Sequence, residues 1–300
     1  MNPAMITILD AGMGKTLAMR GVEIPPTIWS ANALRVAPEA VVAVHRENID
    51  AGANIITTNS YGIIRSDLAK ENIEDQFAAL NELAGELAQQ AVIESASDTQ
   101  IAGSLPPLNG SYRPDRVLRR EVLEPKYQEQ AKLLAPYVDL FICETMSTIT
   151  EAVAAATVAA ETGKPVLVAL TLHDEAIACL RSGETVEDAL DKLAPLEPIG
   201  VVANCCLPER ISDAMPLLAA SGLQYCGGYA NAFTRVPKDW LLDGEKENDG
   251  SLQMRDDLAP PVYSYFVSAW IERGANVVGG CCGTTAAHTE AISELVKTYN

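Results

Sequence analysis

Cysteine is the residue type whose spacing in this sequence points most clearly to chemistry. Seven cysteines occur in 300 residues, and four of them form the adjacent pairs Cys205–Cys206 and Cys281–Cys282. An odd number of cysteines in a chain of this length fits poorly with the disulfide framework of a small secreted protein. In a reducing compartment, the remaining explanations are buried apolar side chains, a reactive thiol or metal ligands.

Three thiolates drawn from the two pairs would bind a tetrahedral zinc ion and leave one position open, as in a catalytic site. Such an ion is a weak Lewis acid, because its ligands neutralise most of its charge, but it can bind and deprotonate an incoming thiol. This chemistry suits alkyl transfer to sulfur better than hydrolysis. Spacing alone leaves zinc binding and ordinary burial equally open, because the sequence has no C-x-x-C pair.

Two acidic residues, Asp10 and Glu144, directly follow apolar runs. Carboxylates at such positions could pair with the ammonium group of an amino-acid substrate. For Asp10 the alternative is a turn or helix-capping aspartate, and for Glu144 it is a structural hydrogen-bonding role.

The elements that must position these residues alternate regularly along the chain. Short apolar runs, typical of buried parallel strands, occur at Ile6–Asp10, Ala53–Thr58, Gln100–Ser104, Val138–Cys143, Pro165–Thr171, Ile199–Asn204, Gln224–Tyr229 and Ala275–Gly280. Segments of helical periodicity occur at Pro38–Ala51, Asp67–Ser95, Leu118–Ala135, Thr148–Thr162, Val186–Leu193, Glu209–Ala220, Asp257–Arg273 and Thr284–Tyr299. Eight strands, each followed by a helix, predict an α/β fold, a (β/α)8 TIM barrel forming a single domain over residues 1–300. An open doubly wound sheet is the alternative.

Local signals support these boundaries. Thr148, with Glu151 three residues later, predicts a capping box at the start of a helix. Gly163 and Gly222 are placed to end helices. The polar, breaker-rich segments Gly103–Asp115 and Asp243–Asp257 are predicted to be surface loops.

The alternation predicts that the unusual residues meet on one rim, because functional groups in both architectures collect beyond the carboxyl ends of the strands. Asp10, Thr58, Ser104, Glu144, Asn204-Cys205-Cys206 and Gly279-Gly280-Cys281-Cys282-Gly283 all lie at such ends. The sixth and eighth strands end on the same rim of a barrel, so sulfurs 76 residues apart could converge there.

Charge and hydropathy exclude some partners. Lys and Arg number 22 against 40 Asp and Glu, giving a net charge of −18 and an isoelectric point near 4.5. This balance argues against nucleic acid and anionic membrane surfaces as partners. The sequence has no apolar run of membrane-spanning length and no evident secretory signal, so we expect a cytoplasmic protein.

Taken together in chain order, these motifs resemble the homocysteine S-methyltransferase family. The resemblance covers essentially the whole chain. It is carried by Asp10-Ala11-Gly12-Met13-Gly14, Thr58-Asn59-Ser60-Tyr61, Gly103-Ser104, Cys143-Glu144-Thr145, Asn204-Cys205 and Gly279-Gly280-Cys281-Cys282-Gly283-Thr284-Thr285. The last motif is very specific, whereas the first two gain weight only from their order and spacing.

The resemblance implies a zinc-dependent barrel that moves a methyl group onto the sulfur of homocysteine, giving methionine. Carried over, the zinc ligands are Cys205, Cys281 and Cys282. The amino-acid site corresponds to Asp10 and Glu144, and Thr58 lies in the matching second-strand motif, where it would help to hold the substrate backbone. Cys206 is expected to be a bystander to the metal.

Departures from the family pattern leave the methyl donor open. Ala11 replaces the usual second residue of the first motif, and the Gly103–Tyr112 loop differs from the common pattern. A sulfonium such as S-methylmethionine fits the length of the chain. Betaine and a separate methyl-corrinoid partner protein are the alternatives. Cys143, Cys179 and Cys226 match no ligand position, and neither do His45, His173 and His288. A capping or surface role is expected for His288.

Two hypotheses from other classes are considered. A non-enzymatic zinc or thiol redox sensor predicts a closed four-thiolate site that recruits Cys206. A metal-free aldolase needs a lysine at a strand end, and neither Lys15 nor Lys164 is well placed for that role.

Overall fold

All eight predicted strands are present in the computed structural model, which describes residues 6–237, 240 and 252–299. They are β1 (Thr7–Ile8), β2 (Ile55–Thr57), β3 (Gln100–Leu105), β4 (Leu140–Met146), β5 (Val166–Leu170), β6 (Gly200–Asn204), β7 (Tyr225–Ala230) and β8 (Val277–Gly280). β4, β5 and β6 are buried along their whole length. This explains why their sequences are almost continuously apolar instead of alternating.

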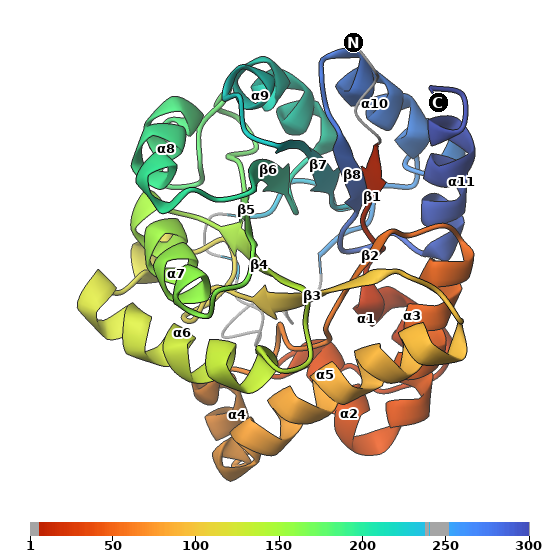
Figure 1. The fold of residues 1–300 in the computed structure, drawn as a ribbon, viewed down its shortest axis with the longest axis vertical. Coiled ribbons are helices and arrows are strands. Elements are labelled where there is room, and N and C mark those ends of the chain that lie inside the picture. The colour runs from red at the N-terminus through yellow and green to blue at the C-terminus, as the bar shows by residue number, and fades with distance from the viewer. Residues whose placement is uncertain (1–5, 238–239, 241–251, 300) are drawn as a thin grey trace.

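The strands form one parallel sheet that closes on itself. The order of paired strands is β1-β8-β7-β6-β5-β4-β3-β2. Between the two ends of this order, Leu9 bridges Ile55, and the Asp10 amide donates to the Ile55 carbonyl at 3.0 Å. Figure 1 shows the strands at the centre with helices around them. The fold is therefore the predicted (β/α)8 barrel, and the alternative of an open sheet is wrong.

Helices connect the strands. In the described residues the α-helices are α1 (Met13–Met19), α2 (Asn32–Val36), α3 (Pro38–Asp50), α4 (Arg65–Lys70), α5 (Phe77–Glu94), α6 (Arg120–Leu134), α7 (Ile149–Glu161), α8 (Val186–Leu193), α9 (Pro208–Ala220), α10 (Pro260–Glu272) and α11 (Ala286–Val296). Four short 3-10 helices accompany them: η1 (Trp29–Ala31), η2 (Glu74–Gln76), η3 (Pro114–Arg116) and η4 (Ala194–Leu196).

Two helical predictions need correction. The single helix expected over Asp67–Ser95 is broken into α4, η2 and α5, because Asn72 adopts a left-handed backbone with φ 56°. Asparagine tolerates that conformation better than most residues do. Helices α1 and α2, in the long connection between β1 and β2, were not predicted. They are short, and tertiary packing outweighs weak periodicity in helices of this length.

The predicted helix ends are mostly confirmed. The Thr148 hydroxyl accepts from the Glu151 amide at 3.1 Å, while the Glu151 carboxylate accepts from the Ser147 amide and not from that of Thr148. Gly163 and Gly222 follow α7 and α9 with φ of 77° and 72°, the left-handed backbone that glycine adopts without strain.

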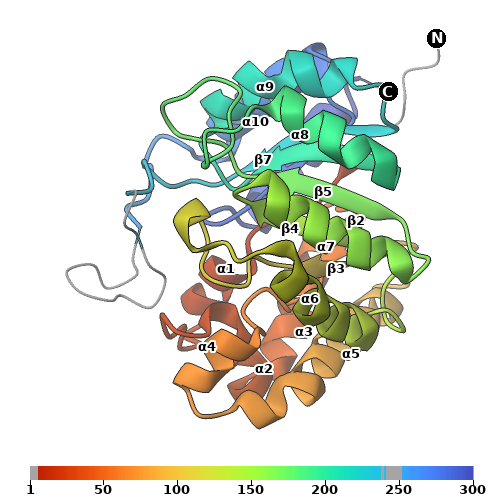
Figure 2. The ribbon, with the colours of Figure 1, turned by 90° about the vertical axis from the view of Figure 1, so that its left-hand side faces the viewer.

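Apolar side chains form two layers of core. One cluster fills the barrel itself and includes Leu9, Ile55, Leu140, Leu167 and Val277. A larger cluster lies between the strands and the surrounding helices. Figure 2 shows α7 lying over β4 and β5, with which it is in contact.

The segment Gly103–Asp115, predicted to be a surface loop, is largely interior. Its first three residues belong to β3, and Leu108 and Tyr112 are buried. Of the second predicted loop, residues 243–251 lie outside the described residues, and residues 252–257 are exposed or half-buried.

Among the described residues, no helix is both long enough and apolar enough to cross a membrane.

Candidate active site

A cavity of about 450 Å³ opens at the carboxyl ends of the strands. All six predicted site residues line it: Asp10, Thr58, Glu144, Cys205, Cys281 and Cys282. They come from the ends of β1, β2, β4, β6 and β8, so the barrel brings together groups that are up to 272 residues apart. This is the rim on which catalytic groups of such barrels collect.

Three thiols converge in this cavity. The sulfur atoms of Cys205, Cys281 and Cys282 all lie within 4.8 Å of one another, the one such group able to hold a metal in the described part of the chain. The Cys205 and Cys282 sulfurs are 3.8 Å apart. A tetrahedral zinc ion with Zn–S bonds of about 2.3 Å has sulfur ligands about 3.8 Å apart. The separation between Cys205 and Cys281 is 2.6 Å, so this edge must open for an ion to contact all three.

The donor set fits zinc. Three thiolates are its preferred ligands, and a group of three leaves the fourth tetrahedral position to face the cavity. The neighbouring strand β7 holds the Cys281–Cys282 turn in place. The Cys281 amide donates to the Ala230 carbonyl at 2.9 Å, and the Cys282 carbonyl accepts from the Ala232 amide at 2.8 Å.

Close backbone packing also requires glycine beside this turn. A Cβ atom added to Gly12 would lie 2.6 Å from the Cys281 carbonyl oxygen. Gly283 has φ 83°, and a Cβ there would lie 2.4 Å from the terminal methyl carbon of Met254. Gly12 is therefore needed for the turn to approach the end of β1, and Gly283 is favoured by its left-handed backbone.

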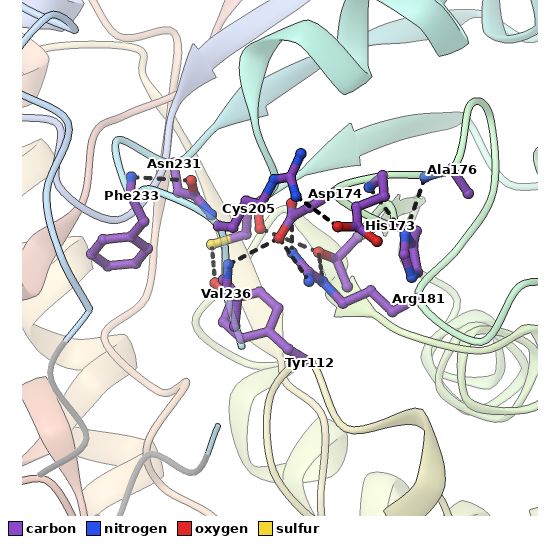
Figure 3. Close-up of polar contacts among 12 residues, drawn as sticks. Tyr112, His173, Asp174, Ala176, Arg181, Cys205, Asn231, Phe233 and Val236 are labelled. Atoms are coloured by element: carbon purple, nitrogen blue, oxygen red, sulfur yellow. Dashed lines mark hydrogen bonds and ion pairs between the residues drawn. The ribbon is translucent and has the colours of Figure 1, made fainter. Parts of the chain in front are cut away.

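Hydrogen bonding shifts the pKa values of the three thiols in opposite directions. Burial alone raises the pKa of Cys205, but hydrogen bonds from Cys281, Cys282 and Tyr112 outweigh it and bring that pKa well below its ordinary value. Donating to Cys205 raises the pKa of Cys281 and of Cys282. The Tyr112 hydroxyl lies 3.1 Å from the Cys205 sulfur (Figure 3). Sequence reasoning did not identify Tyr112, which lies within the supposed surface loop.

Cys206 is not part of the thiol cluster. It is fully buried, and burial raises the pKa of its thiol to about 12. The bystander role predicted for it agrees with this placement, whereas the closed four-thiolate site of a sensor is not formed. None of the three histidines joins the cluster. His288 caps α11, with its Nδ1 atom accepting from the Thr285 amide at 3.2 Å.

Asp10 is held by the neighbouring strand. Its carboxylate accepts from the Thr57 amide at 2.8 Å and from the Thr57 hydroxyl at 3.1 Å. Burial raises the pKa of Asp10 to about 7, against the lowering effect of these hydrogen bonds. The Thr57 contact was missed, although Thr57 directly precedes the Thr58 motif.

Glu144 is held from two sides. Ser104 and Tyr229 donate their hydroxyl groups to its two carboxylate oxygens, Tyr229 at 3.2 Å. Burial raises the pKa of Glu144 to about 7, and the nearby charges of Cys205 and Asp10 add to this effect. Ser104 was placed correctly at its strand end, but Tyr229 could not be assigned to Glu144 because 85 residues separate them.

Neither carboxylate forms an ion pair with a described residue. Lys15 lines the cavity, but it lies in α1 and not at a strand end, and its ammonium donates to the Gly283 carbonyl at 2.9 Å. Two buried carboxylates without a cationic partner are costly to ionise. A ligand that carries an ammonium group would supply the missing charge.

Thr58 is committed to internal hydrogen bonds. Its hydroxyl lies 2.8 Å from the Ser60 hydroxyl and accepts from the Ser104 amide at 3.1 Å. The side chain thus joins the ends of β2 and β3, next to the serine that contacts Glu144.

The homocysteine S-methyltransferase family model matches residues 7–296. The chain belongs to this family. A homocysteine S-methyltransferase of Escherichia coli strain K12 is 28% identical over 306 residues, covering 96% of this chain and 94% of the relative. A selenocysteine methyltransferase of Astragalus bisulcatus is 26% identical, covering 97% and 92%.

Solved structures of family members agree with this assignment. The metallated form of the Escherichia coli homocysteine methyltransferase MmuM superposes with a TM-score of 0.80 at 25% identity. The match covers 97% of this chain and 96% of that one. Family membership together with the shared fold makes this chain a methyltransferase.

Proposed function

We propose that this protein transfers a methyl group from a sulfonium donor to the thiolate of L-homocysteine, forming methionine, and that it uses zinc bound by Cys205, Cys281 and Cys282. The whole chain, residues 1–300, acts as the homocysteine-binding domain. The observation that carries the proposal is the shared cavity, in which three clustered thiols face the same space as two buried carboxylates without cationic partners. Homocysteine offers one group for each: a thiol for the metal and an ammonium for the carboxylates.

The carboxylates bind and orient the amino acid. Thr57 fixes Asp10, and Ser104 with Tyr229 fixes Glu144, so both oxygens of each carboxylate have defined directions. An ammonium group placed between them forms charge-assisted hydrogen bonds with two largely buried carboxylates. Thr58 helps to hold the substrate indirectly, through its hydrogen bond with the Ser104 amide.

The cysteines place the acceptor sulfur. Zinc held by three thiolates keeps a fourth sulfur ligand deprotonated and electron-rich, which is the chemistry that the metal supplies when bound. No general base is needed beyond this, so Glu144, which is near enough to Cys205 for the thiolate charge to raise its pKa, is left to bind the ammonium group. With both reactants held in one cavity, proximity supplies much of the remaining rate advantage.

The donor subsite is suited to a cation. The lining of the cavity includes the aromatic residues Trp29, Tyr61 and Phe233. Aromatic faces attract positively charged alkylated groups. This lining favours a sulfonium such as S-methylmethionine over a neutral donor, and it also accommodates betaine.

The test is a donor panel on the purified, zinc-loaded chain. Zinc per chain is measured first, and homocysteine binding is then titrated. Methionine formation is followed with S-methylmethionine, with betaine and with a methyl-corrinoid protein. Selenocysteine serves as a second acceptor, because a relative bears that activity in its name.

We expect one zinc per chain and methionine formation that depends on the sulfonium. Turnover with betaine or with the methyl-corrinoid protein alone would replace the donor assignment and leave the acceptor reaction intact. A chain that binds neither zinc nor homocysteine would overturn the proposal.

A further inference from the structure

Beside the thiol cluster lies a buried ion pair that the proposed reaction does not use. Arg181 and Asp174 lie in the connection between β5 and α8, and their side chains are 8% and 7% exposed. The guanidinium nitrogens Nη1 and Nη2 donate to the two oxygens of Asp174, each at 3.2 Å. Such a two-pronged pair fixes the plane of the guanidinium group.

Two chains of contacts, each with two steps, lead from Arg181 to Cys205. The guanidinium carbon lies 4.6 Å from the centre of the Tyr112 ring, and the Tyr112 hydroxyl donates to the Cys205 sulfur at 3.1 Å. Arg181 Nε also donates to the Thr171 hydroxyl at 3.4 Å, which in turn donates to the Cys205 carbonyl at 3.2 Å. Figure 3 shows Tyr112, Arg181, Asp174 and Cys205 grouped in this way.

Cys205 needs this support because its backbone is strained. It has φ 46°, a left-handed conformation that non-glycine residues adopt at a cost of order 1–3 kcal/mol. Such a conformation persists only where surrounding contacts determine it. The Cys205 amide donates to the Tyr229 carbonyl at 2.9 Å, so its amide, carbonyl and sulfur are all held.

We propose that Arg181 and Tyr112 are positioning residues for the metal ligand Cys205: the Asp174–Arg181 pair fixes the Tyr112 ring, and the Tyr112 hydroxyl orients the Cys205 sulfur and withdraws electron density from it. The inference rests on the proposed metal site. Trp240 packs against the same ring, with centroids 5.4 Å apart, so the ring is restrained by more than one neighbour. Hydrogen bonds from outside the ligand set typically contribute about 10- to 100-fold to metal affinity.

The test uses metal binding, which does not depend on turnover. Tyr112→Phe removes the hydroxyl and keeps the ring. We expect its zinc affinity, measured by competition with a chelator, to fall about tenfold or more. In the cobalt-substituted protein, the sulfur-to-cobalt charge-transfer band should move to longer wavelength, because the sulfur regains electron density.

Tyr127→Phe is the matched control. Tyr127 is also fully buried, but its hydroxyl has no hydrogen-bond partner, so its removal should change neither quantity. The double variant Asp174→Asn with Arg181→Met removes both charges of the pair together. This double variant should bind zinc more weakly than the parent. Adding Tyr112→Phe to it should lower zinc affinity by a smaller factor than Tyr112→Phe does in the parent chain, because the two sets of changes act on the same contact.

A Tyr112→Phe protein with unchanged zinc affinity and an unmoved cobalt band overturns the inference while leaving the proposed function intact. Fully additive effects overturn the part assigned to Arg181. A parent chain that binds neither zinc nor cobalt overturns the proposed metal site together with this inference.

Discussion

Asn204 and Thr145 exchange two hydrogen bonds across the mouth of the barrel. The Thr145 amide donates to Asn204 Oδ1 at 3.0 Å, and Asn204 Nδ2 donates to the Thr145 hydroxyl at 3.1 Å, with both residues buried. Thr145 follows Glu144 at the end of β4, and Asn204 precedes Cys205 at the end of β6. The pair therefore spans β5 and links the strand end that carries Glu144 to the strand end that carries Cys205.

Replacing Asn204 should disturb the positions of both Glu144 and Cys205. Asn204→Ala leaves the buried Thr145 amide without its partner, and a buried polar group left unpaired costs about 1–3 kcal/mol. Thr145 has φ 63°, which a β-branched residue adopts only when held, so we expect Glu144 to lose its position as well. Denaturant unfolding and the KM for homocysteine are the measurements. Thr145→Ser, which keeps the hydroxyl, is the control and should change neither strongly. An Asn204→Ala protein with parental stability and KM would contradict this view.

The adjacent cysteines allow a matched comparison of ligand and bystander. Cys281→Ser should lose metal and activity together while the barrel remains folded, because two thiolates and a hydroxyl hold zinc much less tightly than three thiolates do. Cys206→Ser should retain the metal, since that thiol lies outside the cluster. Metal content per chain, circular dichroism and methionine formation are measured for both. Retention of zinc by the first variant, or its loss from the second, would show that the ligand set is wrong.

Strand positions were predictable because most strand residues are buried, and β4, β5 and β6, which are buried along their whole length, have almost continuously apolar sequences. The rim residues Asp10, Glu144, Cys205 and Cys281 followed from this pattern, because parallel strands all end on the same side. Local periodicity was enough for long helices such as α7. It failed for α1, whose form depends on packing against η1 and α3.

The residues that orient the site were not predictable in the same way. Tyr229 contacts Glu144 across 85 residues, and Tyr112 contacts Cys205 across 93. Such pairs depend on which side chains point into the cavity, which the sequence of a single strand or loop does not encode. Composition was also misleading at Tyr112, because glycine and proline were taken as signs of exposure.

The two carboxylates make amino-acid binding dependent on pH. Burial raises the pKa values of Asp10 and Glu144 to about 7, so both are largely neutral at pH 6 and largely ionised at pH 8. An ammonium group binds the ionised form, so affinity should rise with pH and level off above both pKa values. Methionine is the appropriate ligand, because its thioether has no proton to release. Calorimetry on the metal-free chain should show binding about tenfold tighter at pH 8 than at pH 6 for each carboxylate required.

Asp10→Asn is the companion variant for that experiment. It should bind methionine more weakly at pH 8, with a shallower dependence on pH, because one of the two titrating groups is gone. An affinity that does not change between pH 6 and pH 8 in the parent chain would argue against recognition of the ammonium by these carboxylates.

Removing a charge from the site should stabilise the fold at the expense of binding. Burial raises the pKa of Glu144 from 4.5 to about 7, so ionising it in the folded chain costs more than in the unfolded chain. At low pH the group is protonated in both states and has no effect. As pH rises from about 4.5 to about 7 the folded state loses stability, up to about 3 kcal/mol, and above that the loss is constant.

Glu144→Gln should therefore unfold at higher denaturant concentration than the parent at pH 8, with a much smaller difference at pH 5. The metal-free protein is used so that zinc does not contribute to the unfolding free energy. The amide retains groups that can pair with Ser104 and Tyr229, while methionine binding should be lost. Glu290→Gln, on the exposed side of α11, is the control and should change stability at neither pH. If Glu144→Gln raises the free energy of unfolding equally at pH 5 and pH 8, the effect comes from packing and not from charge. Only an ionised carboxylate can make the effect depend on pH.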